Sequence, residues 1–551
     1  MTERADIWWK NAIFYGVDVA AFYDSDSDGV GDFRGLTSRL DYLAGLGVTC
    51  LWVMPCYPSP LKDDGYDIAD FYSVHPMLGS LGDFVEFVQA ADSNGIRVLL
   101  DLVANHTSDQ HPWFQSARKD ANSPYRDWYI WSDEPAESYR ELVFPGEEDR
   151  HWTHDPETGQ YYRHRFYSFE PDLNMWNEEI REEIYRIMRF WLALGVSGFR
   201  VDAAPYLLDS PGYDDARSDP HDYLRRFRAF VSRRQGDAIL VGEANLDAEE
   251  QGKYFGSEEH GDELHMLFNF VQNRATYLAL AREDPAPLVK RLNELPRIPL
   301  DAQWLNFART HDELNFGGLS QDELADVFEV FGGEPEMRIY GRGLRRRVAP
   351  MLEGDRRRIE LLYSLLFSLP GAPMLLWGEE IGMGDDPSLP GRLAVRSPMQ
   401  WANAPNGGFS AAPAEQLFRP LVTREYGYDS VNVADQRRSR DSLLNWMERL
   451  IRMRKLCPEF GWGLSQFLDT GKRAVLGQRS DWRGGTVFAF HNLAHEPCEF
   501  DVDVDDEDIE AFVGIFGEDR GIEMAPARIE LGPYGYLWLR ARKQGQYLVV
   551  V

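Results

Sequence analysis

Acidic, basic and imidazole side chains stand at the points where several apolar runs of the sequence end. A carboxyl group can act as a nucleophile or move a proton, and an imidazole or guanidinium can donate hydrogen bonds to a substrate. Because buried acids are costly unless they are paired or used, Asp202, Glu243 and Asp312 together indicate a catalytic site. Asp101 could instead simply hydrogen-bond loop backbone or another buried group. The full set comprises Asp101, His106, Arg200, Asp202, Glu243, His311 and Asp312.

Eight short apolar runs, most of them separated by segments with helical periodicity, must position these side chains. The runs are residues 12–17, 50–55, 97–103, 198–203, 239–244, 265–270, 303–309 and 373–379. This alternation predicts an α/β fold, a closed parallel (β/α)8 TIM barrel, in which functional residues follow the carboxyl ends of the strands. An open doubly wound sheet is the alternative, but no GxGxxG or P-loop sequence follows any run. Segments 36–46, 81–94 and 178–194 are expected to be helices.

Two regions interrupt the alternation and predict further domains. Residues 104–176 form a long connection rich in Trp, Tyr, His and Pro, and we expect an inserted domain B there. After residue 470 the pattern changes to short alternating runs, which are typical of an antiparallel β-sandwich. The predicted organisation is a catalytic barrel, domain A, over residues 1–103 and 177–470, domain B over 104–176, and a C-terminal β domain over 471–551.

The composition excludes several classes of partner. The 551 residues carry 58 Lys plus Arg against 90 Asp plus Glu, a formal net charge of -32, so nucleic acid and anionic membranes would be repelled. Abundant aromatic residues beside carboxylates favour a neutral polar ligand such as a sugar. Residues 1–10 lack the pattern of a secretory signal, and the four cysteines have no CxxC spacing, so a cytoplasmic protein is expected.

Four motifs carry a resemblance to a known family. The segments DLVANH ending at His106, GFRVD ending at Asp202, GEAN containing Glu243 and THD ending at Asp312 are similar to the four signature segments of the α-amylase family, glycoside hydrolase family 13. They occur in the order of that family and on the expected strands. The resemblance implies a catalytic barrel, a domain B after the third strand and a C-terminal β-sandwich.

The resemblance also implies a role for each motif residue. Asp202 would be the nucleophile that forms a covalent glucosyl-enzyme, and Glu243 the acid that then acts as base, as retaining glycosidases require. Asp312 would stabilise the transition state. Arg200, on the same strand face as Asp202, would keep that carboxylate ionised. The histidines His106 and His311 would donate hydrogen bonds to the sugar.

Further substrate contacts follow from the same resemblance. Tyr66 would stack on the terminal glucose, Asp63 would bind its hydroxyl groups, and Arg392 would close the same pocket. Phe166 lies in a segment, HRF, that is similar to one in related enzymes. A pocket with a blocked end favours exo-action on short α-glucosides such as maltose.

We expect calcium as a structural cofactor and no organic cofactor. The acids at alternate positions in DSDSDGVGD resemble a loop that wraps oxygen atoms around a cation. The expected ligands there are Asp24, Asp26, Asp28, Val30 and Asp32. The resemblance implies a second calcium site, formed by Asn105, Asp172 and the carbonyls of Tyr206 and Leu207.

The particular activity stays open between related reactions. The closest resemblance is to trehalose synthase-type and α-glucosidase-type members, so the chain is predicted to be an α-glucosidase or transglucosylase, with isomerisation of maltose and trehalose as the alternative. Residues 209–219, where isomerases carry a longer lid, are short here. A non-catalytic sugar-binding or transporter-ancillary protein is disfavoured because Asp202 and Glu243 are both present. Whether the chain forms a homo-oligomer is also open.

Overall fold

The computed structural model describes residues 7–135, 141–208, 219–257, 261–502, 509–518, 523–524 and 528–543. Residues 209–218, nearly all of the segment that takes the position of the lid, lie outside these ranges, as do parts of the C-terminal domain. Eight parallel strands close into a barrel in the order β1-β14-β10-β9-β8-β7-β3-β2. They are β1 Phe14–Val17, β2 Cys50–Val53, β3 Arg97–Leu102, β7 Gly198–Val201, β8 Ile239–Gly242, β9 Met266–Phe268, β10 Gln303–Phe307 and β14 Ala372–Leu376. The predicted TIM barrel is confirmed, and each predicted run contains or overlaps one of these strands.

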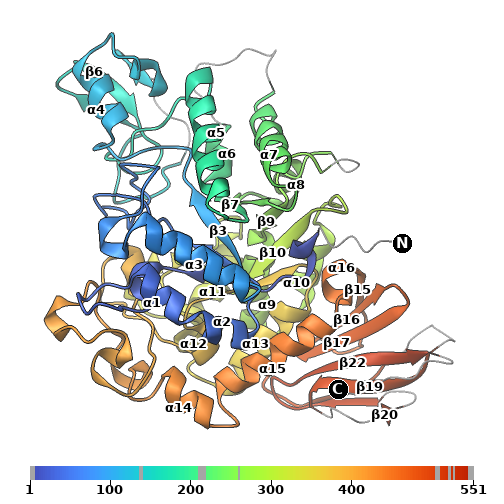
Figure 1. Ribbon diagram of the computed structural model, residues 1–551. Helices are drawn as coiled ribbons and strands as arrows, with labels where there is room; N and C mark the ends of the chain where they lie inside the picture. The colour runs from blue at the N-terminus through green and yellow to red at the C-terminus, as the bar shows by residue number, and fades with distance from the viewer. Residues whose placement is uncertain are drawn as a thin grey trace.

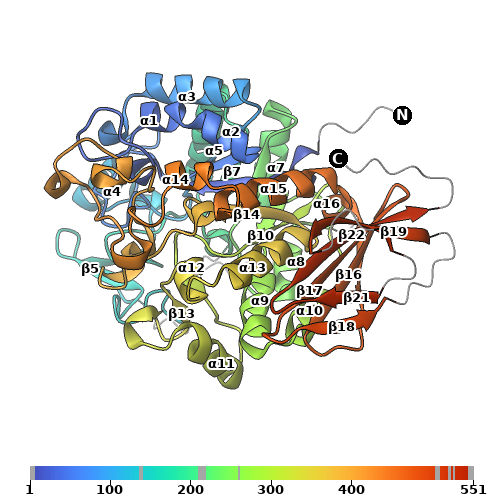
Figure 2. The ribbon, with the colours of Figure 1, turned by 90° about the horizontal axis from the view of Figure 1, so that it is seen from below.

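The barrel strands are buried on both faces, which explains their nearly continuous apolar sequences. Every residue of β1, β2, β7 and β8 is buried. The helices cover the outside of the barrel (Figures 1 and 2). They include α3 Leu81–Ser93, α5 Glu178–Ala193, α7 Asp222–Arg234, α9 Phe270–Arg282, α10 Ala286–Asn293, α11 Gln321–Phe331, α13 Arg356–Ser368 and α15 Leu443–Leu456. None of the described helices has the length and apolar character needed to cross a bilayer.

One predicted helix is divided in two. The segment expected as a single helix over 36–46 covers the end of α1 Phe33–Ser38 and all of α2 Leu40–Leu46, with Arg39 outside both. The guanidinium of Arg39 lies 3.9 Å from the ring centre of Tyr23 and 4.4 Å from that of Trp401. These cation–π contacts hold the side chain between distant parts of the chain, and local periodicity contains no information about such a tertiary contact.

The long connection between β3 and β7 has a small apolar core of its own. It contains α4 Pro112–Lys119 and a three-stranded sheet of β4 Trp131–Ser132, β6 Gln160–Arg163 and β5 Trp152–Asp155. Aromatic residues pack between helix and sheet, and the core includes Phe114, Trp128, Tyr129 and Tyr162. Figure 1 shows α4 and β6 away from the barrel, at the top of the view. We keep the name domain B for residues 104–176, whose exact boundaries remain a prediction.

The C-terminal part contains two antiparallel sheets with an apolar layer between them. A six-stranded sheet has the order β15-β16-β17-β22-β19-β20, and β18 Cys498–Asp501 pairs with β21 Arg528–Leu531. The six strands are β15 Leu464–Leu468, β16 Val475–Trp482, β17 Gly485–Asn492, β22 Tyr536–Lys543, β19 Ile509–Gly517 and β20 Glu523–Met524. Strand β15 precedes the predicted boundary at residue 471. Figure 2 shows this domain beside α13 and α15. Trp538 donates a hydrogen bond to Ser364 of α13 and thereby connects the domain to the barrel.

Candidate active site

Three neighbouring strands present the predicted catalytic groups at one end of the barrel. Asp101 of β3 is paired in register with Arg200 of β7. Asp202 follows the end of β7 directly, and Glu243 follows the end of β8. Their backbone N–H groups continue the parallel ladder, because Asp202 bonds to the carbonyl of Leu102 and Glu243 bonds to that of Val201. The strand register therefore places both carboxyl groups at the carboxyl end of the barrel.

Arg200 connects the acids at the floor of the site. Its Nη1 atom lies 2.6 Å from Oδ1 of Asp202 and 2.5 Å from Oδ1 of Asp101. Its Nη2 atom lies 2.5 Å from Oε2 of Glu243. Charge-assisted hydrogen bonds of this kind are the strong ones, and a planar guanidinium fixes the directions of its partners. One buried cation thus holds two candidate catalytic carboxylates side by side.

Asp101 has a supporting position beneath these groups. Its side chain accepts a hydrogen bond from Nε1 of Trp52 at 2.8 Å and from the hydroxyl of Tyr66 at 3.2 Å. It is fully buried and does not line the cavity. Its contacts with Arg200 and Trp52 are those of a residue that orients the guanidinium, so the reading of Asp101 as a buried hydrogen-bonding residue fits the structure.

The Asp202 and Glu243 carboxyl groups have strongly altered acidity. Burial raises the pKa of Asp202 to about 7, against the opposing effect of Arg200. Burial likewise raises the pKa of Glu243 to about 7, again opposed by Arg200 and reinforced by Asp202. Since each carboxylate disfavours ionisation of the other, the two groups titrate as a pair. Near neutral pH this pair can hold a single proton, which supplies one anion and one acid.

Asp312 lies on the loop after β10 and belongs to a second charge network. Its Oδ1 atom lies 2.7 Å from Nη1 of Arg392 and 2.8 Å from Nη2 of Arg396. Burial opposes its ionisation, but the guanidinium groups of Arg392 and Arg396 hold the pKa of Asp312 well below its usual value. Arg392 also pairs with Asp63, so a single guanidinium bridges Asp63 and Asp312. The sequence did not point to Arg396.

The two predicted histidines lie beside the aromatic rings of Tyr66 and Phe166. Tyr66 and His311 are stacked with ring centres 5.4 Å apart and an interplanar angle of 8°. Burial lowers the pKa of His106 to about 3, so this imidazole is neutral. Among the described residues, Nε2 of His106 has no hydrogen-bond partner although the atom is buried. A buried donor without a partner is costly, and a hydroxyl group of a ligand would satisfy it.

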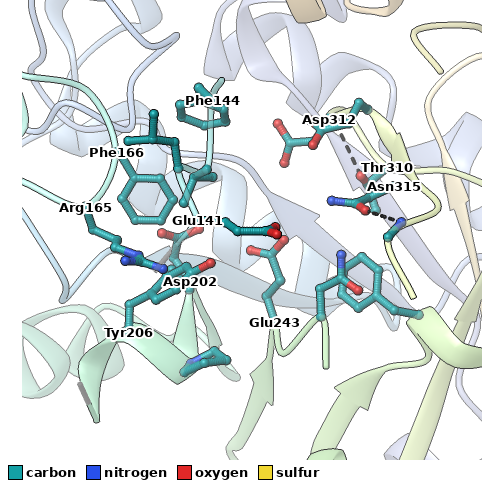
Figure 3. Close-up of a pocket in the computed structure, with 18 of the residues that line it drawn as sticks. Glu141, Phe144, Arg165, Phe166, Asp202, Tyr206, Glu243, Thr310, Asp312 and Asn315 are labelled. Atoms are coloured by element: carbon teal, nitrogen blue, oxygen red, sulfur yellow. Dashed lines mark hydrogen bonds between the residues drawn. The ribbon is translucent and has the colours of Figure 1, made fainter. Parts of the chain in front are cut away.

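These groups surround one cavity of about 610 Å³, a size typical of small-molecule sites. Figure 3 shows Asp202 and Glu243 on one side, Asp312 across from them, and Phe166 and Tyr206 in the wall. Arg200 and His311 do not line the cavity, but Arg200 bonds to Asp202 and Glu243, and His311 stacks on Tyr66. Eight residues predicted from the sequence line the cavity, namely Asp63, Tyr66, His106, Phe166, Asp202, Glu243, Asp312 and Arg392, together with Tyr206 from the predicted metal set.

The outer wall was not predicted from the sequence. Phe144 of domain B lies with its ring centre 4.8 Å from the guanidinium of Arg392 and 5.4 Å from the ring of Tyr340. Arg342 donates a hydrogen bond to the carbonyl of Val143. Domain B and the segment after β10 therefore meet over Arg392. An isolated aromatic or arginine on a loop has no distinctive spacing, so no local signal marks Phe144 or Arg342.

The acidic loop near the N-terminal end brings three carboxylates together. One oxygen or more from each of Asp24, Asp26 and Asp28 lies within 4.8 Å of the others. Asp24 is buried, and burial together with Asp28 raises the pKa of Asp26. Asp32 is not part of this group, and its carboxylate accepts hydrogen bonds from Ser25 and from the first turn of α1. The three converging acids suit a divalent cation.

The residues of the second predicted metal site also converge. Asn105, Asp172, Tyr206 and Leu207 all line a cavity of about 10 Å³ between domain B and the barrel. Arg163 lines it too, and its Nε atom lies 3.3 Å from Oδ2 of Asp172. The carboxylate thus faces a guanidinium within the very site where the resemblance implies a cation.

The barrel carries two paired carboxyl groups at the ends of adjacent strands, an arginine that bridges them and a third acid opposite. Together these features define a carbohydrate-active enzyme of the glycosidase type. The family model for the α-amylase catalytic domain matches residues 18–314 and 345–463. The chain therefore belongs to the α-amylase family, glycoside hydrolase family 13.

Characterised relatives and solved structures agree with this assignment. The trehalose synthase/amylase TreS of Mycobacterium tuberculosis is 41% identical over 543 residues, which cover 97% of this chain and 90% of that protein. A glucan 1,6-alpha-glucosidase of Streptococcus pneumoniae is 31% identical over 515 residues, and the match covers 86% of this chain and 89% of that protein. The crystal structure of an alpha-amylase from H. orenii has a TM-score of 0.79 and 29% identity, and the match covers 97% of this chain and 100% of that one.

Proposed function

We propose that the protein is a retaining enzyme that transfers the terminal glucosyl unit of short α-glucosides, such as maltose, through a covalent bond to Asp202. The observation that carries this proposal is the Arg200 guanidinium, which holds Asp202 and Glu243 side by side. Retaining glycosidases need their two carboxyl groups about 5–5.5 Å apart, closer than inverting ones. Two neighbouring nitrogen atoms of one guanidinium suit this close pairing.

The first step breaks the glycosidic bond. The carboxylate of Asp202 attacks the anomeric carbon while protonated Glu243 gives its proton to the leaving oxygen. Asp312, ionised by its arginine partners, stabilises the positive charge that develops on the sugar ring. Neutral His106 donates a hydrogen bond to a sugar hydroxyl, and Tyr66 provides a flat apolar surface for the ring.

The second step returns the glucosyl unit to an acceptor. Glu243, now ionised, removes a proton from the acceptor hydroxyl, and that oxygen displaces Asp202 from the anomeric carbon. Water as the acceptor gives hydrolysis, and a sugar as the acceptor gives transfer. Release and recapture of the same glucose, with attachment through its anomeric hydroxyl, converts maltose into trehalose. The 41% identity to TreS favours this isomerisation as the second candidate.

Product analysis separates these reactions. Incubation of the enzyme with maltose, with trehalose and with sucrose, followed by chromatography of the products, is the direct test. We expect glucose and transfer products from maltose if an external acceptor takes the glucosyl unit, and trehalose with little glucose if isomerisation dominates. Absence of any product from all three sugars, and from an aryl α-glucoside, would contradict the proposed function.

Arg392 is proposed to close the end of the cavity against longer glucans. Replacing Arg392 with alanine leaves Asp63 and Asp312 without the guanidinium that bridges them. We expect kcat/KM for maltose to fall by a factor on the order of 10², because misplacement of substrate-positioning groups costs about that much. The fall for maltotetraose should be smaller, since the end is open. Steady-state kinetics on both sugars test this, and an equal loss on the two would refute the closed-end assignment.

We propose that calcium binds at Asp24, Asp26 and Asp28. A cation there would relieve the mutual repulsion of three carboxylates and fix the loop that precedes α1. Adding EDTA is expected to lower the melting temperature of the wild-type protein and to have no effect on the double variant Asp26→Asn/Asp28→Asn. Differential scanning fluorimetry measures both, with added calcium as the control. An unchanged melting temperature of the wild type in EDTA would exclude a stabilising ion.

The cysteines support a reducing compartment such as the cytoplasm. All four, Cys50, Cys56, Cys457 and Cys498, lie in the described part of the chain and are free thiols. Three of them are buried, as expected for thiols with a packing role.

A further inference from the structure

The junction between domain B and the barrel contains a buried carboxylate, that of Asp172, which is paired with the guanidinium of Arg163. Asp172 is 4% exposed, and Arg163 of strand β6 is 7% exposed. The guanidinium Nε atom lies 3.3 Å from one carboxylate oxygen of Asp172. The other oxygen accepts hydrogen bonds from the backbone N–H of Arg165 at 2.9 Å and from Nδ2 of Asn105 at 3.2 Å. Both oxygen atoms therefore face nitrogen donors.

Such surroundings do not suit a calcium ion. Calcium takes six to eight oxygen ligands at about 2.3–2.6 Å. Here Asn105 presents its amide nitrogen to Asp172, and the nearby guanidinium would repel a second cation. The cavity of about 10 Å³ is at the lower limit for a single water molecule. The residues that the family resemblance assigns to this metal therefore do not fit it in this chain.

We propose that Arg163 takes the place of the calcium ion at Asn105 and Asp172 and holds domain B against the barrel as a built-in cation. The junction is a short antiparallel bridge between His106 and Asp172. Its backbone hydrogen bonds include one from Leu173 to the carbonyl of Asn105. Arg163 thus acts on the active-site cavity through Asp172, as a positioning residue.

The consequence for the cavity follows from the sequence neighbours of these residues. His106 comes directly after Asn105, and Arg165 and Phe166 come soon after Arg163. The active-site cavity is lined by His106, Arg165 and Phe166. The ring centres of His106 and Phe166 are 5.1 Å apart. A shift of the Arg163–Asp172 contact would therefore move the wall that binds the donor sugar, with less effect on Asp202 and Glu243, which the barrel strands position.

Metal analysis tests the proposal without reference to activity. The double variant Asp26→Asn/Asp28→Asn is dialysed against calcium chloride and then against calcium-free buffer, and bound calcium is measured by atomic emission. We expect none at the junction. Calcium that remains in this variant and is lost on the further change Asp172→Asn would overturn the proposal. Any calcium that does not depend on Asp172 leaves the junction metal-free, as proposed.

Kinetics test the positioning role. In Arg163→Met we expect KM for an aryl α-glucoside to rise about tenfold while kcat changes by less than about threefold. Arg163→Lys, which keeps the charge, should restore most of the affinity. Arg118→Met is the matched control, since Arg118 also pairs with a buried aspartate of domain B, Asp155, but does not line the small junction cavity beside Asp172. An unchanged KM in a folded Arg163→Met variant would overturn the role. If that variant does not fold, the metal analysis still decides between arginine and calcium.

Discussion

Asp202→Asn is expected to lower the turnover of maltose and of aryl α-glucosides by a factor on the order of 10⁴. The asparagine amide is nearly isosteric with the carboxylate and can still accept a hydrogen bond from Arg200. It cannot form the glycosyl ester on which the two-step reaction depends. Arg200 keeps Asp101 and Glu243 as partners, so the floor of the site is not left with an unpaired buried cation.

Steady-state rates on an aryl α-glucoside measure this loss, and circular dichroism checks that the variant is folded. Glu249→Gln is a suitable control because Glu249 is an exposed acid on α8 Ala248–Lys253, shortly after the same strand that carries Glu243. The control should keep wild-type rates. Wild-type activity in Asp202→Asn would show that another group is the nucleophile.

Glu243→Gln is expected to give a different pattern, because the lost group is an acid and base. Turnover of maltose should fall by a factor on the order of 10³, within the range for removal of a proton-transfer group. A substrate with a dinitrophenyl leaving group needs no protonation, so its first step should be affected much less. Added azide should then accelerate the reaction, since azide attacks the glucosyl-enzyme without a general base.

The pH dependence provides a second test of Glu243. Burial places the pKa of the carboxyl pair near 7, so wild-type kcat/KM should fall below that pH as both groups become protonated. It should also fall above that pH as Glu243 loses its proton. The variant should lose the alkaline decline on maltose, whose leaving group needs that proton. Azide acceleration in Asp202→Asn instead of Glu243→Gln would reverse the two assignments.

The barrel and its catalytic acids could be predicted because their signals are local and ordered along the chain. Each apolar run of a parallel strand ends at the same edge of the barrel, so Asp101, Arg200 and Glu243 had to lie near one another once the fold was recognised. Asp312 belongs to the same pattern. Arg392 was placed at the pocket only through the resemblance to a known family, and its bond to Asp312, 80 positions away, was not predicted.

The remaining parts of the site depend on how separate loops approach each other. Arg396 bonds to Asp312 although nothing in its own segment marks it as a partner. Phe144 reaches Arg392 only because domain B folds over the segment after β10. Arg163 appears in the sequence as an ordinary charged residue of a strand, and its contact with Asp172 requires the turn that follows β6. Such contacts form between surfaces, and periodicity within one segment does not encode them.

The proposed closure of the cavity by Arg392, through its salt bridges with Asp63 and Asp312, would also determine the order in which molecules leave the enzyme. With that end blocked, the glucosyl unit would be innermost and the aglycone would stand between it and solvent. The aglycone must depart first, and glucose formed by hydrolysis must depart last. Glucose should accordingly compete with the donor substrate as an inhibitor. The first product, in contrast, waits at the mouth of the cavity beside a reactive ester and can return as the next acceptor.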